Sequence, residues 1–187
     1  MPELGGVMKD NREISLLHPA KFIGTWFGVG LAPKAPGTFG SIAALPFAYL
    51  IQTQWGNVAL LIAAVLAFIV GCIACEKYLP YVDALDPKEM VIDEVHGQWL
   101  LLAFMHPTLI SYLVGLFLFR LFDILKPWPI SVADRNIHGG FGVMFDDTLA
   151  AVYPIVLAAL AVVAARMTGH SEMARSIESY LSVHNVF

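Results

Sequence analysis

The stretch VALLIAAVLAFIVGCIAC, residues Val58–Cys75, decides the fold class of this chain. It contains 18 residues and no charge. As an α-helix it would be about 27 Å long, at about 1.5 Å per residue. Because the hydrocarbon core of a bilayer is about 30 Å thick, the stretch predicts a membrane helix. Its two cysteines, Cys72 and Cys75, share a helix face, and we interpret them as small apolar fillers rather than a redox or metal pair.

Two other stretches have a similar composition. Thr148–Ala165 is a second uncharged run of 18 residues, and its Pro154 is expected to kink a membrane helix without preventing it. Thr38–Trp55 gives a weaker signal, because it contains Pro46 and its far end runs into the polar sequence QTQWGN at 52–57. We expect that sequence to form a turn at a membrane surface.

Residues 95–124 are also apolar but are interrupted at His106-Pro107, which predicts a short helix, a tight turn and a longer helix. The whole chain is 58% hydrophobic and only 14% charged, with a mean hydropathy of +0.69. Soluble domains carry about 25% charged residues, so an ordinary soluble enzyme and a disordered chain are both disfavoured. The expected fold is an all-α, polytopic membrane bundle with about four or five embedded helices.

The chain is expected to divide into three parts. Residues 1–22 form an N-terminal cytoplasmic or interfacial segment, 23–165 a catalytic membrane domain, and 166–187 a mixed-charge tail. The first twenty residues carry five charges and no apolar core, so a cleaved signal peptide is not indicated. A net charge of −4 gives no reason to expect nucleic-acid binding.

Lys and Arg predict the orientation, because cytoplasmic segments of membrane proteins carry more of them. With the N-terminus inside and apolar hairpins at 38–75 and 95–124, only Arg166 and Arg175 lie outside. Three polar segments, 33–41, 83–94 and 120–147, then meet at the cytoplasmic face. The nine inside residues are Lys9, Arg12, Lys21, Lys34, Lys77, Lys88, Arg120, Lys126 and Arg135.

The first polar segment, APKAPGTFGS, leads into an apolar helix. Gly37 permits a close backbone approach, and Thr38 or Ser41 could cap the helix. Amides at a helix N-terminus attract phosphate, and Lys34 lies beside them. The alternative is a simple turn at the start of a membrane helix.

The other two segments carry carboxylates. Asp93 and Glu94 open one apolar helix, and Asp146 and Asp147 are expected to open the last span after a pliable glycine loop. Acids near a helix N-terminus can be merely stabilising. Adjacent carboxylates at a membrane boundary, however, need a cation or water to stay ionised. His96 lies beside them, and we interpret it as either a proton carrier or a structural histidine.

Arg120 and Asp123 share a helix face at i, i+3, and they could be only a boundary ion pair. Trp128 is interpreted as an interfacial anchor.

Ionisable groups at membrane depth are costly and usually functional, which favours a functional interpretation of the acids taken together. They suggest one or two Mg²⁺ ions, and the basic residues suggest an anionic substrate. We therefore infer metal-assisted chemistry on a phospholipid phosphate.

Four motifs occur in order along the chain. They are Ala35-Pro36-Gly37-Thr38 with Gly40-Ser41; Asp93-Glu94 with Gly97; Phe119-Arg120 with Phe122-Asp123 and Lys126-Pro127; and Gly139-Gly140 with Gly142 and Asp146-Asp147. Together they resemble the motifs of the phosphatidylglycerophosphatase A family of bacterial inner-membrane enzymes, and the resemblance covers about residues 20–165.

The resemblance implies Mg²⁺-dependent hydrolysis of phosphatidylglycerophosphate to phosphatidylglycerol and phosphate, the last step of phosphatidylglycerol synthesis, at the bilayer and with the site facing the cytoplasm. Attack by a metal-bound water is favoured, and an aspartyl phosphoenzyme stays open. The candidate catalytic residues and metal ligands are Asp93, Glu94, Asp123, Asp146 and Asp147. The candidate substrate-binding residues are Lys34, Gly37, Thr38, Ser41, Arg120, Lys126 and Arg135.

Three alternatives stand beside this hypothesis. A CDP-alcohol-type phosphatidyl transferase would place two aspartates four residues apart, whereas Asp146 and Asp147 are adjacent. A divalent-cation carrier or channel would explain the acids but not the basic residues beside them. A soluble helical bundle is the third.

Overall fold

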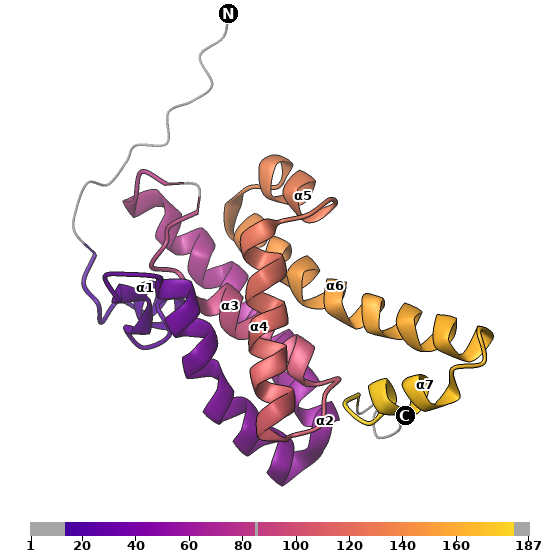
Figure 1. Ribbon diagram of the computed structural model, residues 1–187. Coiled ribbons are helices and arrows are strands. Elements are labelled where there is room, and N and C mark those ends of the chain that lie inside the picture. The colour runs from indigo at the N-terminus through magenta and orange to yellow at the C-terminus, as the bar shows by residue number, and fades with distance from the viewer. Residues whose placement is uncertain (1–13, 85, 182–187) are drawn as a thin grey trace, which may run out of the picture.

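The computed structural model describes residues 14–84 and 86–181, and over these ranges the chain is all-α (Figure 1). No β-strand occurs within them, and one isolated bridge pairs Met105 with Leu181. The predicted all-α class is confirmed. The helices are α1 (Pro19–Gly24), α2 (Pro36–Tyr78), α3 (Ile92–Leu102), α4 (Leu109–Leu125), α5 (Ile130–Asn136), α6 (Gly139–Met167) and α7 (Ser171–Glu178), with the 3-10 turns η1 (Val29–Leu31) and η2 (Leu79–Tyr81).

Helix α2 consists of two arms that reverse direction at Gly56. The backbone there has φ 82° and ψ 178°, a left-handed conformation that glycine adopts without steric cost. Across the turn, the buried Gln52 amide donates to Asn57 Oδ1 at 2.8 Å. Figure 1 shows the second arm running back in the opposite direction to the first. The predicted hairpin over 38–75, with its turn at 52–57, is therefore confirmed.

Helices α3 and α4 form the second predicted hairpin, and its break contains His106-Pro107. Thr108 begins α4 as its N-cap, because its Oγ1 accepts a hydrogen bond from the Ser111 amide at 3.2 Å. The expected short helix, turn and longer helix are confirmed.

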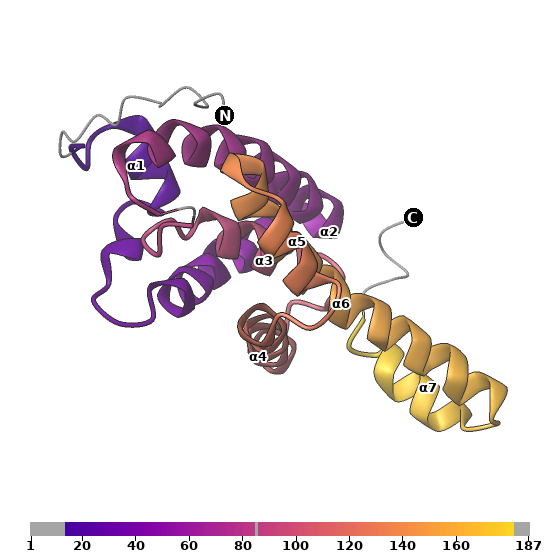
Figure 2. The same ribbon diagram turned by 90° about the horizontal axis from the view of Figure 1, so that it is seen from above.

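Helix α3 lies at the centre of the bundle, in contact with α2, α4 and α6 (Figure 2). Its Gly97 allows this packing, since a Cβ there would lie 2.5 Å from the Phe119 ring and 3.0 Å from the Asp147 carbonyl oxygen. His96 links two neighbours, with Nδ1 2.8 Å from the Ala64 oxygen and Nε2 2.9 Å from Thr148 Oγ1. These contacts fix the start of α3 relative to α6.

Helix α6 starts earlier than the sequence predicts. It begins at Gly139, so Asp146 and Asp147 lie about two turns inside it rather than at its opening. The glycines of the expected loop pack this first turn against α2. The Gly140 amide donates to Glu76 Oε2 at 2.7 Å, and a Cβ on Gly140 would lie 2.2 Å from a carbonyl oxygen of α2. The expectation of a pliable loop was wrong.

The start of α2 also differs from one expectation. The helix begins at Pro36 after Ala35, which makes no side-chain cap. Neither Thr38 nor Ser41 caps it, and the buried Ser41 hydroxyl instead donates to the Gly37 carbonyl at 2.9 Å.

Two stretches, Pro36–Tyr81 and Gly139–Met167, are long and apolar enough to cross a membrane. Only 28% of the most apolar window of each is buried by the rest of the protein. A core helix of a soluble protein would be mostly covered. The apolar side chains of α2 and α6 instead face outward, which matches the expected membrane-embedded bundle.

The expected C-terminal tail contains α7, which folds back against α6 (Figure 2). Arg166 pairs with Glu178 across this contact. Lys9 and Arg12 of the predicted cytoplasmic segment lie outside the described residues, as does the end of the tail after Leu181.

Candidate active site

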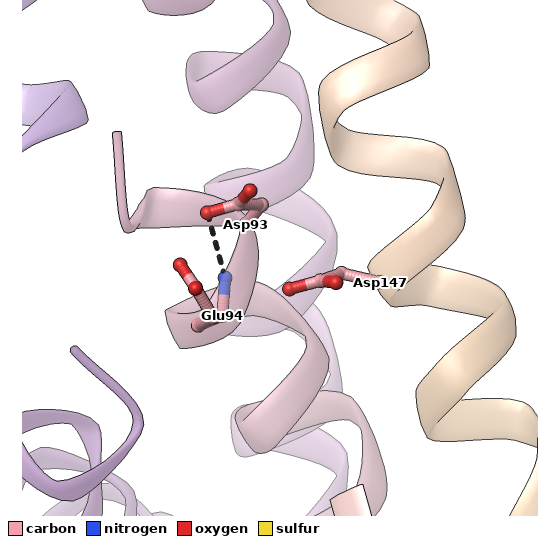
Figure 3. A group of neighbouring side chains, drawn as sticks. All are labelled: Asp93, Glu94 and Asp147. Carbon is pink, nitrogen blue, oxygen red and sulfur yellow. Dashed lines mark hydrogen bonds between the residues drawn. The ribbon is translucent and has the colours of Figure 1, made fainter. Parts of the chain in front are cut away.

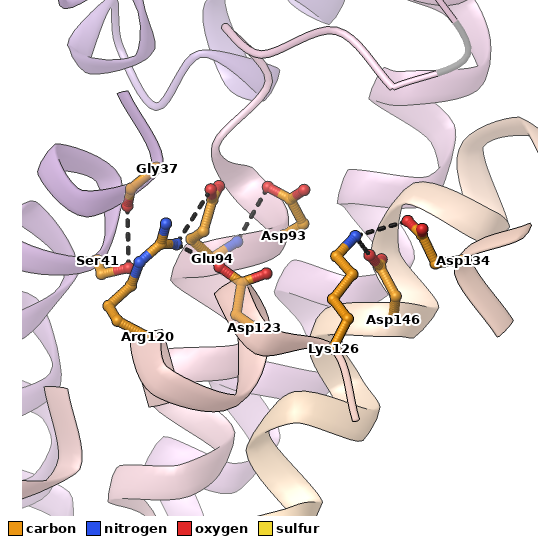
Figure 4. Close-up of polar contacts among 9 residues, drawn as sticks. All are labelled: Gly37, Ser41, Asp93, Glu94, Arg120, Asp123, Lys126, Asp134 and Asp146. Carbon is orange, nitrogen blue, oxygen red and sulfur yellow. Dashed lines mark hydrogen bonds and ion pairs between the residues drawn. The ribbon is translucent and has the colours of Figure 1, made fainter. Parts of the chain in front are cut away.

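A cavity of about 190 Å³ opens where the ends of several helices meet. The start of α2, the loop before α3, the first turn of α3, the end of α4 and the body of α6 all contribute to it, so segments far apart in the sequence converge (Figure 4). Its lining residues are Ala35, Pro36, Gly37, Asp86, Lys88, Met90, Asp93, Glu94, Arg120, Asp123, Lys126, Asp146 and Asp147.

Three carboxylates form a compact cluster on the wall of this cavity. One oxygen from each of Asp93, Glu94 and Asp147 lies within 4.8 Å of the others (Figure 3). Asp93 is 7% exposed and Asp147 3%. Glu94 Oε2 and Asp147 Oδ2 are buried and have no hydrogen-bond partner. Buried polar atoms without a partner are costly, and oxygen atoms in this arrangement are the ligands that a hard divalent cation takes. The cluster therefore fits a Mg²⁺ ion.

The electrostatics of the cluster agree with that fit. Burial raises the pKa of Asp93 well above its ordinary value, and the neighbouring Glu94 and Asp147 raise it further. Burial also raises the pKa of Glu94, although the hydrogen bond with Asp93 and the charge of Arg120 oppose the shift. A bound cation would relieve the repulsion among these groups and favour their ionised forms.

Arg120 joins the cluster to a fourth carboxylate. Its guanidinium lies 3.3 Å from Glu94 Oε1 and 2.7 Å from Asp123 Oδ2 (Figure 4). Arg120 Nε is buried without a partner. The Arg120–Asp123 pair is the i, i+3 ion pair that the sequence predicts, and it lies on the cavity wall rather than at a bare helix boundary.

Lys126 occupies the other side of the cavity. Its Nζ lies 2.5 Å from Asp134 Oδ1 and 2.5 Å from Asp146 Oδ2. Burial alone would lower the pKa of Lys126, but the hydrogen bonds and charges of both aspartates raise it above its ordinary value. The ammonium group therefore stays protonated at the cavity rim.

The adjacent aspartates of α6 point to different partners. Consecutive helical residues are about 100° apart around the axis, so Asp147 reaches the three-carboxylate cluster while Asp146 reaches Lys126. This divergence explains how one dipeptide serves both sides of the cavity.

Gly37 brings the backbone of α2 against the charged groups. A Cβ there would lie 1.9 Å from Glu94 Oε1 and 3.0 Å from Arg120 Nη1. The first-turn amides of a helix have no acceptor within the helix, so the start of α2 presents its positive end to the cavity.

The structure brings most of the predicted site residues together. All five candidate acids line the cavity, with Gly37, Arg120 and Lys126. The remaining candidates, Lys34, Thr38, Ser41 and Arg135, lie outside its lining.

Sequence reasoning did not single out Asp86, Lys88 and Asp134. Asp86 and Lys88 line the cavity from the loop before α3, and Asp134 holds Lys126 from α5. Their position in segments 83–94 and 120–147, already expected at the same membrane face, was the available signal.

The fold and the cavity define a class of protein: a helical membrane protein with a site suited to a cation and an anion side by side. The model of the family "Phosphatidylglycerophosphatase A" matches residues 22–162. The chain belongs to this family and is therefore an enzyme, a phosphatase.

Two similar proteins carry the name of this family, and a third carries the name of another phosphatase. The chain is 37% identical to "Phosphatidylglycerophosphatase A" of Haemophilus influenzae over 78% of its own length and 90% of that protein. It is 35% identical to "Phosphatidylglycerophosphatase A" of Escherichia coli, over 81% and 87%. It is 38% identical to "Putative phosphatidylinositol-3-phosphatase" of Bacteroides thetaiotaomicron, over 74% and 91%. No solved structure matches the chain.

Proposed function

We propose that the protein hydrolyses the terminal phosphate monoester of phosphatidylglycerophosphate, giving phosphatidylglycerol and phosphate, and that it requires Mg²⁺. The observation that carries the proposal is the cavity in which three clustered carboxylates face Arg120 and Lys126. The names of two relatives support this substrate. The third relative, "Putative phosphatidylinositol-3-phosphatase", is named for a different phosphorylated lipid.

In this proposal Asp93, Glu94 and Asp147 hold the metal, because they supply the clustered and partly unpartnered oxygens. When bound, Mg²⁺ offsets the carboxylate charge and polarises phosphoryl oxygens. Asp123 and Asp146 lie outside the three-carboxylate cluster. Asp123 pairs with Arg120, and Asp146 pairs with Lys126.

The chain's own residues then orient the reaction. Arg120, Lys126 and the first amides of α2 bind the phosphate oxygens and stabilise the charge that develops on them. As a water oxygen bonds to phosphorus, the bond from phosphorus to the glycerol oxygen breaks. We assign the proton transfers to Asp123 and Asp146, which line the cavity. One carboxylate takes a proton from the water, and the other gives a proton to the glycerol oxygen.

We further propose that the protein lies in the bacterial inner membrane with this cavity at the cytoplasmic face. The Lys and Arg distribution supports this orientation. Lys88, Arg120 and Lys126 line the cavity, while Arg166 lies in the last turn of α6 and Arg175 follows in α7. The lipid headgroups of the inner leaflet would then lie at the depth of the cavity.

Phosphate release from phosphatidylglycerophosphate in detergent micelles tests the proposal. Purified protein is expected to release phosphate with added Mg²⁺ and to lose this activity in excess chelator, with recovery when Mg²⁺ is restored. Full activity in chelator would refute the metal requirement. Cation flux into liposomes without any phosphate release would point to the carrier alternative.

A further inference from the structure

A second cavity, of about 300 Å³, lies on the outward face of α6. Its lining is almost entirely apolar and extends over one stripe of the helix, together with a proline from the turn before α5. The lining residues are Pro129, Leu149, Val152, Tyr153, Val156, Leu157 and Leu160. We call it the α6 groove.

The α6 groove continues the helix face that carries Asp146. Residues three, four and seven positions apart lie one above the other on a helix. Leu149 and Tyr153 follow Asp146 by three and seven residues, and Leu160 follows Tyr153 by seven. Asp146 lines the active-site cavity, so a single face of α6 leads from the charged cavity directly into the apolar groove.

One ring contact and one sequence neighbour join the groove to the site. The Tyr153 ring packs against Phe122 of α4 with centroids 4.7 Å apart, and the next residue, Asp123, lines the active-site cavity. Pro129 is three residues beyond Lys126, whose Nζ binds Asp146. The groove therefore begins beside the charged cavity.

The position of the groove in the bilayer and its length suit an acyl chain of a lipid in one leaflet. Trp128, next to Pro129, is 76% exposed, as expected for an aromatic anchor at the headgroup level. From Leu149 to Leu160 the helix rises about 16 Å, at about 1.5 Å per residue, and this is about half of the hydrocarbon core. The groove thus runs from the interface towards the middle of the bilayer.

We propose that the α6 groove binds an acyl chain of the lipid whose phosphate occupies the active-site cavity. This inference rests on the proposed function, because it assigns the apolar part of that substrate. A headgroup bound by Lys126, which contacts Asp146, places its acyl chains at the bilayer side of the cavity, where the groove opens. Burying a chain there stabilises the complex in proportion to the apolar area covered.

A blocking substitution tests the groove. Val156 is 48% exposed and lies in the groove, so Val156→Trp fills it without disturbing the buried face of α6. With a long-chain phosphatidylglycerophosphate in mixed micelles, we expect kcat/KM to fall about tenfold, as for a filled hydrophobic pocket. With the dihexanoyl lipid, whose chains barely enter the groove, kcat/KM should change less than about twofold.

The matched control is Val163→Trp, the same change at an exposed position on α6 outside the groove; it should leave both substrates unaffected. An equal loss on both lipids, or no loss on the long-chain lipid, would overturn the inference. A changed oligomeric state of Val156→Trp by light scattering, with chain-length dependence intact, would assign the groove to a second copy and also overturn it. If the wild type releases no phosphate from either lipid, the proposed function itself fails.

Photocrosslinking provides a measurement on the unaltered chain. Phosphatidylglycerol with a photoreactive group in its acyl chain should label the peptide that contains Leu149–Leu160, and excess phosphatidylglycerophosphate should suppress this labelling. Labelling that excess substrate does not suppress would mean that ordinary bilayer lipid covers the groove, and the inference would fall.

Discussion

Asp147 contributes a buried carboxylate oxygen without a hydrogen-bond partner to the three-carboxylate cluster. The substitution Asp147→Asn keeps the shape and removes the charge. If the cluster holds Mg²⁺, several kcal/mol of stabilisation are lost, which corresponds to a rate lower by about 10²–10³-fold. Phosphate release at saturating Mg²⁺ measures the effect. Glu172→Gln, at an exposed position of α7, is the control and should keep the wild-type rate.

The raised pKa values of Asp93 and Glu94 predict a pH-dependent affinity for Mg²⁺. Burial is the main cause of both shifts, so the metal-free cluster holds protons at a pH where ordinary carboxylates have lost them. Mg²⁺ binds the ionised groups, so its affinity should rise with pH and fall as the pH drops through the raised pKa values. Calorimetric titrations between pH 6 and 8, in buffers of different ionisation enthalpy, would measure the affinity and the released protons. A dissociation constant independent of pH, with no proton release, would contradict this account.

Gly37 should not tolerate a side chain. In Gly37→Ala the new Cβ would meet Glu94 Oε1 at 1.9 Å, so the carboxylate or the start of α2 must move. We expect activity to fall about tenfold or more, since small displacements of catalytic groups are costly, while the fold survives. Gly169→Ala provides a comparison, because its Cβ would meet nothing within 4 Å, although its left-handed φ of +79°, unlike the helical backbone at Gly37, adds local strain. Equal activity of both variants would show that the close approach at Gly37 is unimportant.

Among the single residues of the site, the sequence alone singles out the charged residues that lie next to apolar helices. Asp93-Glu94, Arg120 with Asp123, and Asp146-Asp147 stand out because carboxylates are rare beside apolar helices. Asp86 and Asp134 lack this signal, since they occur in polar segments where acids are common. Their position depends on how the loop before α3 and helix α5 fold, and no spacing within the sequence specifies that.

A buried polar cluster around Gln52 holds the turn of the α2 hairpin, at the end of the helices opposite the cavity. The Gln52 amide donates to Asn57 and to the carbonyls of Leu102 and Met105, and its oxygen accepts from the Tyr112 hydroxyl. Gln52→Leu removes these bonds and leaves buried partners unsatisfied. Hydrogen bonds in membrane proteins average about 0.6 kcal/mol each, so we expect a loss of about 2 kcal/mol.

A loss of about 2 kcal/mol corresponds to a Tm lower by about 4–8 °C for a chain of this size. Thermal unfolding in detergent measures it, and the activity of the remaining folded protein should be unchanged because the cavity is remote. The control is Gln54→Leu, the same substitution at an exposed position two residues away. If both variants have the same Tm, the cluster does not stabilise the hairpin.

The elements also show where prediction from sequence ends. Uncharged runs and the breaks at 52–57 and His106-Pro107 predict both hairpins, because hydropathy reports burial in a bilayer directly. The start of α6 was misjudged because its glycines resemble a loop in composition. Only the contact with Glu76 and the α2 backbone shows that they permit close helix packing.

For the whole molecule, the proposal requires opposite ends of α6 to lie on opposite sides of the membrane. The helix has 29 residues and is about 43 Å long at about 1.5 Å per residue. Glu76 contacts its start, so the exposed Lys77 marks the cavity side, while the exposed Ser171 follows its far end.

Single cysteines, Lys77→Cys and Ser171→Cys, can be placed in a chain in which Cys72 and Cys75 are replaced by alanine. A membrane-impermeant maleimide should label the Ser171→Cys protein in intact spheroplasts and the Lys77→Cys protein only after permeabilisation. The reverse pattern would put the cavity outside, and labelling of both from one side would mean that α6 does not cross the bilayer.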